Sequence, residues 1–226
     1  RDEADIIITN PPFSLFREFL AWIVAANKQF VIIANLNAIT YKEVFPLIKN
    51  NKLWLGPSIS SGDREFQVPD NYPLNAAGWR IDENGKKYLR IKGVRWFSNL
   101  DHGRRHQPLP LMTLADNLRF SKHREIKGAG TYLKYDNYNA IEVPFTDAIP
   151  ADYTGIMGVP ISFLDKYNPD QFEIIGSSMT LGESMATIAE KGTYSAGGPR
   201  FYLDSRNGTY QRLYDRIVIR NKKVQV

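Results

Sequence analysis

The stretch Ala4-Asp5-Ile6-Ile7-Ile8-Thr9-Asn10-Pro11-Pro12-Phe13 decides the fold that we expect. Three consecutive isoleucines between polar residues are typical of a short strand buried on both faces, as in a parallel sheet. Pro11 and Pro12 lack the backbone N–H that a sheet ladder needs, so the chain must leave the sheet there as a stiff, extended loop. Ligands of open α/β sheets bind at this carboxyl edge of the strands. The sequence therefore predicts a ligand site at Asn10–Phe13.

The residues after this stretch predict an α/β fold. Ser14 is a candidate N-cap for a helix that runs to about Lys28, with apolar residues at helical spacing on one face. Phe30–Asn35 has the composition of a second buried strand. Strand, helix and strand in this order predict a right-handed βαβ unit.

Weaker patterns follow along the chain. We expect a second helix over Tyr41–Asn51 that Pro46 interrupts, and a strand near Leu53–Gly56. Residues 57–85 are rich in Ser, Gly, Asp, Pro and Asn, which predicts a long loop region with one short strand at 65–68. Further strands are expected at 87–92, 94–97, 172–175 and 213–220, with a short helix at 162–167.

Composition limits the classes of protein. The 226 residues are 43% hydrophobic, which is enough for one core or for a core with an added lobe. The absence of cysteine excludes disulfides, thiolate metal sites and a cysteine nucleophile. The net charge of +5 permits a polyanionic partner without establishing one. Without a signal pattern or a long apolar run, we expect a cytoplasmic protein with no membrane partner.

Three segments resemble a known family. Asn10–Phe13 after a hydrophobic strand resembles the (Asp/Asn)-Pro-Pro-(Tyr/Phe) motif of amino methyltransferases that use S-adenosylmethionine. Val94–His102 and Gly155–Leu164 resemble segments of the EcoRI-type adenine-specific DNA methyltransferases. The motif alone is shared with protein-glutamine and RNA methyltransferases, whereas the combination is much more specific.

The resemblance implies an architecture and an activity. Residues 1–107 would form the catalytic-loop half of a partial, Rossmann-like methyltransferase sheet, closed by an antiparallel hairpin around Gly93. Residues 108–226 would form an α+β lobe that recognises double-stranded DNA. The implied activity is N6-adenine methylation of DNA in a restriction–modification system, with S-adenosylmethionine as the cofactor.

The chemistry explains the residue types of the motif Asn10, Pro11, Pro12 and Phe13. Adenine N6 is a poor nucleophile because its lone pair is delocalised into the ring. The Asn10 side-chain oxygen and the Pro11 carbonyl would accept the two amino hydrogens and stabilise the nitrogen as it attacks. Phe13 would stack on the base, which must leave the duplex before it can react.

Two sets of residues are candidates for DNA contact. The phosphate candidates are basic residues of one stretch: Arg104, Arg105, Arg119, Lys122, Arg124 and Lys127. Asn137 and Asn139 lie among tyrosines, and their amides could read base edges. The alternatives are a solvated charged face for the first set and a plain hairpin for the second.

The sequence contains neither a convincing metal-binding motif nor a glycine-rich turn of the kind that binds the cofactor. Asp101, His102 and His106 have a ligand-like spacing, but Gly103 and the intervening arginines argue against a cation, so we expect no metal. Gly128–Gly130 and Ser195–Gly198 are glycine-rich, but neither follows a strand and opens a helix. In the family that the chain resembles, the cofactor motif precedes the Asn-Pro-Pro-Phe motif, so the resemblance implies that it lies upstream of Arg1, in an N-terminal part of the same protein.

Two other functions remain open from the sequence. The motif is compatible with a methyltransferase that acts on protein glutamine or RNA, which would not need a large basic lobe. A DNA-binding fragment without catalysis follows directly if the cofactor part is truly absent.

Overall fold

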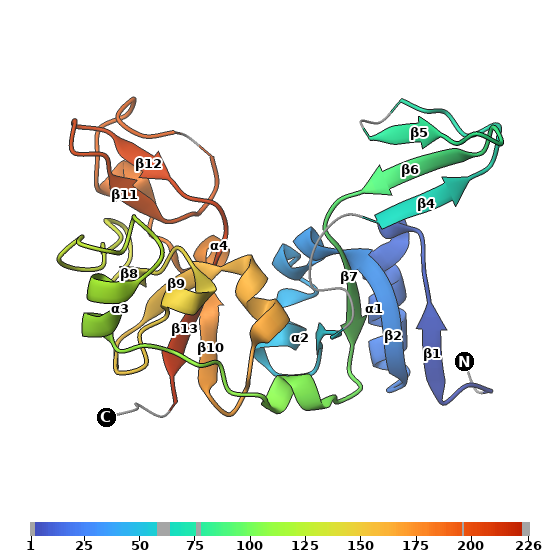
Figure 1. Cartoon of the computed structure of the whole chain (residues 1–226), viewed down its shortest axis with the longest axis horizontal. Helices are drawn as coiled ribbons and strands as arrows, with labels where there is room; N and C mark the ends of the chain where they lie inside the picture. The colour runs from blue at the N-terminus through green and yellow to red at the C-terminus, as the bar shows by residue number, and fades with distance from the viewer. Residues whose placement is uncertain (1–2, 58–63, 76–77, 196, 223–226) are drawn as a thin grey trace. The chain divides into compact units, whose positions relative to one another are not determined.

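The structure is a computed structural model that describes residues 3–57, 64–75, 78–195 and 197–222. The chain is a mixed α/β protein with several sheets, as the sequence predicts (Figure 1). It divides into two compact units, Arg1–His102 and Gly103–Val226, which we describe separately. The roles assigned above to residues 1–107 and 108–226 stay predictions.

The first unit is built on a four-stranded sheet. Its order is β1 (Ile6–Thr9), β2 (Gln29–Asn35), β7 (Val94–Ser98) and β3 (Trp54–Leu55). β1 and β2 are parallel and are joined by helix α1 (Phe16–Ala25), whereas β7 runs antiparallel to both β2 and β3. The predicted βαβ unit is therefore present, and α1 presents its buried side chains to the sheet.

The prediction that β1 is buried on both faces is wrong. Ile6 is 46% exposed and Ile8 is 70% exposed. Among the described residues, β1 pairs with β2 along one side only and forms the edge of its sheet. Ile6 and Ile8 are two positions apart and therefore lie on the same face of β1, which none of the described residues covers enough to bury them.

The helix boundaries also differ from the prediction. Ser14 is not the N-cap, because Phe13–Leu15 forms a 3-10 turn in which the Leu15 N–H donates to the Pro12 carbonyl at 2.9 Å. Helix α1 begins only after this turn and ends at Ala25, before Asn27 adopts a φ of 49°.

Helix α2 (Phe45–Lys49) carries Pro46 in its first turn, where a missing N–H is tolerated. Pro46 therefore lies near the start of the helix, where it does not interrupt the hydrogen bonding.

A separate three-stranded antiparallel sheet is inserted into the first unit. β4 (Arg64–Val68), β6 (Lys87–Ile91) and β5 (Trp79–Ile81) pair in that order, and Figure 1 shows them extending away from the end of the four-stranded sheet. The predicted loop region thus holds two strands; its residues 58–63 and 76–77 lie outside the described residues.

The predicted hairpin around Gly93 is wrong, because the two strands that flank this glycine do not pair with each other. β6 pairs with β4 and β5, whereas β7 pairs with β2 and β3, so the two strands belong to different sheets. Gly93 has a φ of 67°, and its carbonyl accepts the Leu36 N–H at 2.6 Å. This turn sends the chain from one sheet to the other, which a side chain at 93 would oppose.

The second unit contains another four-stranded sheet. Its order is β10 (Phe172–Ser177), β13 (Arg216–Asn221), β9 (Met157–Pro160) and β8 (Ile141–Glu142), antiparallel except between β8 and β9. A hairpin of β11 (Tyr202–Asp204) and β12 (Tyr210–Arg212) and the helices α3 (Leu114–Phe120) and α4 (Ser178–Leu181) complete it.

The core of this unit forms where the sequence places its apolar runs. Phe163 lies in the expected short helix, a 3-10 helix over Ile161–Lys166, and packs edge-on against Phe172 at 5.2 Å between ring centroids. The last strand begins at Arg216, later than predicted. No helix within the described ranges has the length and apolarity needed to cross a membrane.

Candidate active site

The predicted motif lies at the carboxyl edge of the first sheet. Asn10 follows β1 directly, and because β1 and β2 are parallel, the end of β2 at Asn35 faces the same edge. Pro11 is buried, Asn10 and Pro12 are exposed, and Phe13 is half-buried. The buried proline therefore fixes a loop whose amide and aromatic ring both remain accessible.

Two hydrogen-bond acceptors in this loop are available to a ligand. Among the described residues, neither the Asn10 side-chain amide nor the Pro11 carbonyl takes part in a hydrogen bond. The Pro12 carbonyl differs, because it accepts the Leu15 N–H at 2.9 Å. The loop thus offers one side-chain oxygen and one carbonyl oxygen in consecutive residues, the pair that an amino group requires.

Packing beneath the motif holds it in place. Phe16 of α1 lies 5.2 Å from Phe97 of β7, measured between ring centroids, and both rings are fully buried. Leu20 and Ile23 continue the same buried face of the helix. A helix that starts three residues after the motif and is anchored in the core restricts the loop to one geometry.

The neighbouring loop is fixed by a residue that the sequence analysis did not single out. The Asn35 side chain donates to the Lys92 carbonyl at 2.8 Å and accepts the Asn37 N–H at 2.9 Å. Asn35 stands at the carboxyl end of an apolar run, as Asn10 does, so the same sequence signal could have singled it out. Because its side chain hydrogen-bonds to backbone groups, Asn35 stabilises the edge of the sheet.

The first unit also places a cation beside an aromatic ring. The Arg17 guanidinium carbon, in the first turn of α1, lies 5.5 Å from the centroid of the Tyr41 ring. Both side chains are at the surface. Sequence periodicity could not have paired them, because they belong to different elements.

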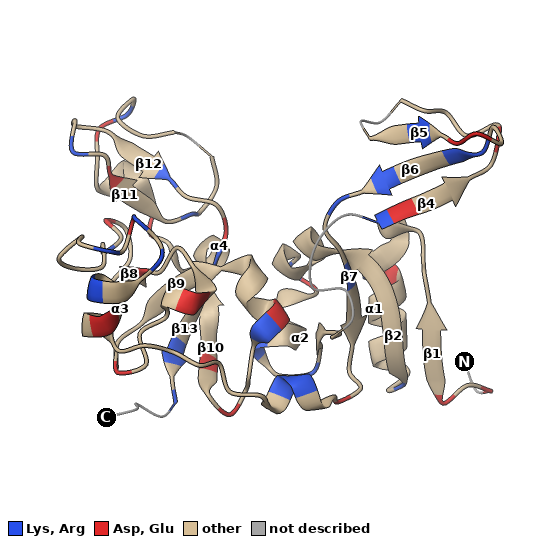
Figure 2. Cartoon of the chain, in the orientation of Figure 1, with Lys and Arg blue, Asp and Glu red and all other residues tan. Residues whose placement is uncertain are grey.

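The basic phosphate candidates are not equivalent in the structure. Arg104, Arg119, Lys122, Arg124 and Lys127 are exposed, whereas Arg105 is only 6% exposed. Burial argues against the predicted phosphate contact by Arg105, and we do not retain it. In Figure 2, acidic as well as basic residues occur on α3 and the loops next to it.

One carboxylate partly neutralises this stretch. Lys122 Nζ lies 2.7 Å from Asp147, and His123 Nε2 lies 2.8 Å from the same carboxylate. Burial alone would raise the pKa of Asp147, but the hydrogen bonds from Lys122 and His123 lower it to about 2. The His123 ring also stacks on Phe145 at 3.7 Å between centroids. These contacts hold the loop after α3 in place.

The two asparagines predicted to read bases differ sharply. Asn137 is 1% exposed; its amide donates to the Glu183 and Arg200 carbonyls, and its oxygen accepts the Tyr202 N–H. This burial argues against base contact by Asn137, which instead ties three loops together. Asn139 is exposed and stays a candidate.

The tyrosines around Asn137 belong to the core of the second unit. Tyr132 and Tyr135 are 4% and 5% exposed. Burial raises the pKa of the Tyr132 hydroxyl, which donates to the Ala148 carbonyl at 2.6 Å. A hydroxyl held this way cannot contact a base edge. The tyrosines in this stretch therefore serve to pack the core of the second unit.

Neither glycine pair fits the turn that S-adenosylmethionine requires. Gly128 and Gly130 both have a φ of 77°, and no helix starts after them. Gly197 and Gly198 precede β11 and also open no helix. We therefore assign the cofactor to none of the described residues. No described group of three His, Asp or Glu side chains could hold a metal ion.

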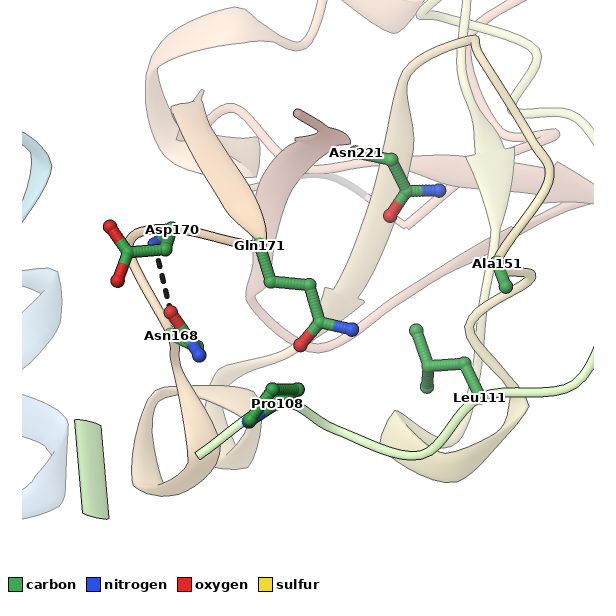
Figure 3. Close-up of a pocket in the computed structure, with 7 residues that line it drawn as sticks. All are labelled: Pro108, Leu111, Ala151, Asn168, Asp170, Gln171 and Asn221. Carbon is green, nitrogen blue, oxygen red and sulfur yellow. Dashed lines mark hydrogen bonds between the residues drawn. The ribbon is translucent and has the colours of Figure 1, made fainter. Parts of the chain in front are cut away.

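Figure 3 shows a cavity of ≈ 250 Å³ in the second unit, lined by Pro108, Leu111, Ala151, Asn168, Asp170, Gln171 and Asn221. Its amide side chains are occupied by the backbone: Gln171 bonds both the N–H and the carbonyl of Leu109. Asn221 donates to the carbonyls of Pro150 and Tyr153. The lining therefore serves to connect loops, and we assign no chemistry to it.

Comparison with known proteins defines the class. The family model described as "Adenine-specific methyltransferase EcoRI" matches residues 1–222. The chain belongs to this family. No solved structure matches it.

Three curated relatives support this membership. The chain is 46% identical over 192 residues to the Type II methyltransferase M.EcoRI of Escherichia coli, covering 85% of this chain and 56% of that protein. It is 36% identical to M.MgeORF184P of Mycoplasma genitalium and 34% identical to M.MpnI of Mycoplasma pneumoniae, each over 224 residues and 98% of this chain. These alignments cover 66% and 65% of the two mycoplasma proteins, so the chain spans less than two thirds of each relative.

Proposed function

We propose that this chain is the catalytic-loop and DNA-contacting part of a site-specific DNA methyltransferase that modifies adenine N6 in a restriction–modification system. The observation that carries the proposal is the pair of available acceptors at Asn10 and Pro11, at the carboxyl edge of β1, in a member of the EcoRI family. S-adenosylmethionine is the proposed methyl donor.

The loop would act on the amino group of the base. Asn10 and Pro11 each accept one N6 hydrogen, which pulls the nitrogen towards a tetrahedral geometry and localises its lone pair. The N6–methyl bond would form as the sulfonium–methyl bond of the donor breaks and S-adenosylhomocysteine leaves. The nitrogen would then gain positive charge, which both oxygens bind more strongly than the neutral amino group. No base is required before transfer, because the nitrogen can release its proton afterwards.

Phe13 and the two prolines complete the proposed site. Phe13 is partly exposed, so the face of an extruded adenine can stack on its ring. Pro11 and Pro12 present no N–H, so they cannot donate to the amino group and oppose the required orientation. The proposed specificity for an amino group thus follows from two adjacent acceptors, the Asn10 side-chain oxygen and the Pro11 carbonyl, beside two residues without a backbone N–H.

The edge of β1 supports a Rossmann-like sheet that continues beyond the described strands. Ile6 and Ile8 are exposed on a strand whose outer edge has no described partner. We propose that a part of the same protein that carries the methyl-donor turn adds a strand beside β1 and an element that packs on the face where these isoleucines lie. Burying the exposed parts of the two isoleucines would contribute roughly 2–3 kcal/mol.

A direct product assay tests the function. The intact protein is incubated with S-adenosylmethionine and duplex DNA, and the DNA is digested to nucleosides for mass spectrometry. We expect N6-methyldeoxyadenosine. Methylated RNA or methylated protein glutamine, with unmodified DNA, would overturn the proposal in favour of another acceptor. DNA binding without any methylated product would indicate a DNA-binding protein without catalysis, and would also overturn the proposal.

A further inference from the structure

Tyr214 is the most exposed large apolar side chain among the described residues, at 90%. It lies in the short segment between β12 and β13, in the red part of the chain in Figure 1. A tyrosine in this position contributes almost nothing to the core. Nothing in the motif or in the basic stretch uses it.

The backbone that carries Tyr214 is held firmly. The next residue, Asp215, lies 2.5 Å from Arg200 Nε in an ion pair whose side chains are 23% and 18% exposed. On the other side, Arg216 directs Nη1 towards the Tyr214 and Asp215 carbonyls at 3.4 and 3.5 Å while its Nε and Nη2 bind the buried Glu142. The ring is therefore exposed on a backbone that is already held in place, which lowers the entropy cost of binding.

A groove of ≈ 410 Å³ lies next to this ring. It is lined by Ser195, Arg200, Arg212, Leu213, Tyr214 and Asp215. Asp215 balances Arg200, whereas Arg212 makes no ion pair with any described residue. The groove thus combines an aromatic face with one uncompensated positive charge.

Gly197 allows Arg212 to take this position. A Cβ at residue 197 would lie only 2.8 Å from Arg212 Nη1, and Gly197 has a φ of 136° that other residues rarely adopt. The guanidinium therefore rests against the glycine loop. Gly197 lies in a stretch that fails the test for a cofactor turn, but it makes room for the Arg212 guanidinium.

We propose that this groove binds a nucleotide of DNA, with Tyr214 stacked on a base and Arg212 paired with a neighbouring phosphate. An aromatic ring and a guanidinium side by side match the two parts of a nucleotide, and aromatic stacking tolerates any base. In a duplex, the stacked base belongs to a kinked or opened step. The excess positive charge favours this polyanion over a protein partner. The inference rests on DNA being the substrate in the proposed function.

Three variants of the intact protein test this site by fluorescence anisotropy with a labelled target duplex. Tyr214→Ala should weaken DNA binding about tenfold, the loss of one stacking contact. Tyr214→Phe keeps the ring and should stay within about twofold of the wild type. Arg212→Gln should weaken binding and reduce the salt dependence by about one unit of slope. Tyr214 is too exposed for its loss to unfold the protein, which circular dichroism verifies.

Photo-crosslinking gives an independent readout. Duplexes with 5-iododeoxyuridine at successive positions should form a crosslink that mass spectrometry maps to Tyr214. Wild-type protein that binds DNA, with Tyr214→Ala binding equally well and no crosslink, would overturn the inference but leave the proposed function intact. Equal losses in Tyr214→Ala and Tyr214→Phe would overturn stacking in favour of a hydroxyl contact. A wild type that binds no DNA would overturn both.

Discussion

Arg216 and Glu142 form a buried ion pair that joins β13 to β8. Arg216 Nη2 lies 2.6 Å from Glu142 Oε1, and Nε lies 3.0 Å from Oε2. The side chains are only 12% and 6% exposed, and the Tyr135 hydroxyl donates to the same carboxylate. Burial alone would lower the pKa of Arg216, but the Glu142 carboxylate raises it, so the guanidinium stays charged.

Glu142→Gln should therefore destabilise the protein by about 3 kcal/mol or more, because it leaves a buried guanidinium without its counter-charge. Urea unfolding measures this. The matched control is Glu173→Gln, which removes the Arg220 partner at the same 2.6 Å distance but with side chains 49% and 45% exposed. That loss should stay below about 1 kcal/mol. Equal effects of the two substitutions would show that burial does not distinguish these pairs.

Asn137→Ala should destabilise the second unit without changing sequence preference. It removes three hydrogen bonds and leaves two carbonyls and one N–H unsatisfied in the interior, a cost of about 2–3 kcal/mol or more. The exposed Asn139 serves as the comparison. Asn139→Ala should leave the free energy of unfolding unchanged and relax discrimination at one base pair by roughly 1–3 kcal/mol. The opposite pattern in a panel of single-base variants would contradict this division.

Asp147 should make the contribution of the loop after α3 to the free energy of unfolding dependent on pH in the acidic range. Its pKa of about 2 lies below the ordinary 3.8, so its contribution to stability is complete above pH 3.8 and is lost as the pH falls towards 2. The unfolding free energies of the wild type and Asp147→Asn should therefore differ at neutral pH and converge between about pH 4 and pH 2. A difference that stays constant across this window would rule out the titration.

The exposed basic residues near α3 should contribute to affinity through phosphates. Neutralising Arg119, Lys122 and Arg124 together should weaken binding to all duplexes similarly and flatten the salt dependence by up to about three units of slope. Lys122 already pairs with Asp147, so its share should be the smallest of the three. Altered sequence preference with an unchanged salt slope would assign these residues another role.

Local pattern was enough to predict part of this architecture. The βαβ unit and the motif after β1 follow from short-range periodicity and from proline chemistry, which act within a few residues. The partners of β6 and β7 did not follow, because the turn at Gly93 joins strands of two sheets and no local signal records which strand pairs with which. Pairing in a sheet is set by contacts far apart in sequence.

Burial was the other property that the sequence could not supply. Asn137 and Arg105 are residue types that often contact DNA, yet tertiary packing buries both side chains in the protein. Conversely, three isoleucines predicted a buried strand, but none of the described residues covers the face of β1 that carries Ile6 and Ile8 enough to bury them. Exposed Tyr214 drew no attention because nothing in its local sequence marks the ion pairs that fix it.

The central claim is that Asn10 acts on the reacting amino group. The most direct test measures single-turnover transfer of a labelled methyl group to duplex DNA by the intact protein and by Asn10→Ala. We predict a loss on the order of a hundredfold or more with nearly unchanged DNA affinity, because the oxygen contributes mainly in the transition state and phosphates dominate binding. Asn10→Asp, which keeps an acceptor oxygen, should retain more activity. Transfer by Asn10→Ala within a few-fold of the wild type would contradict the account.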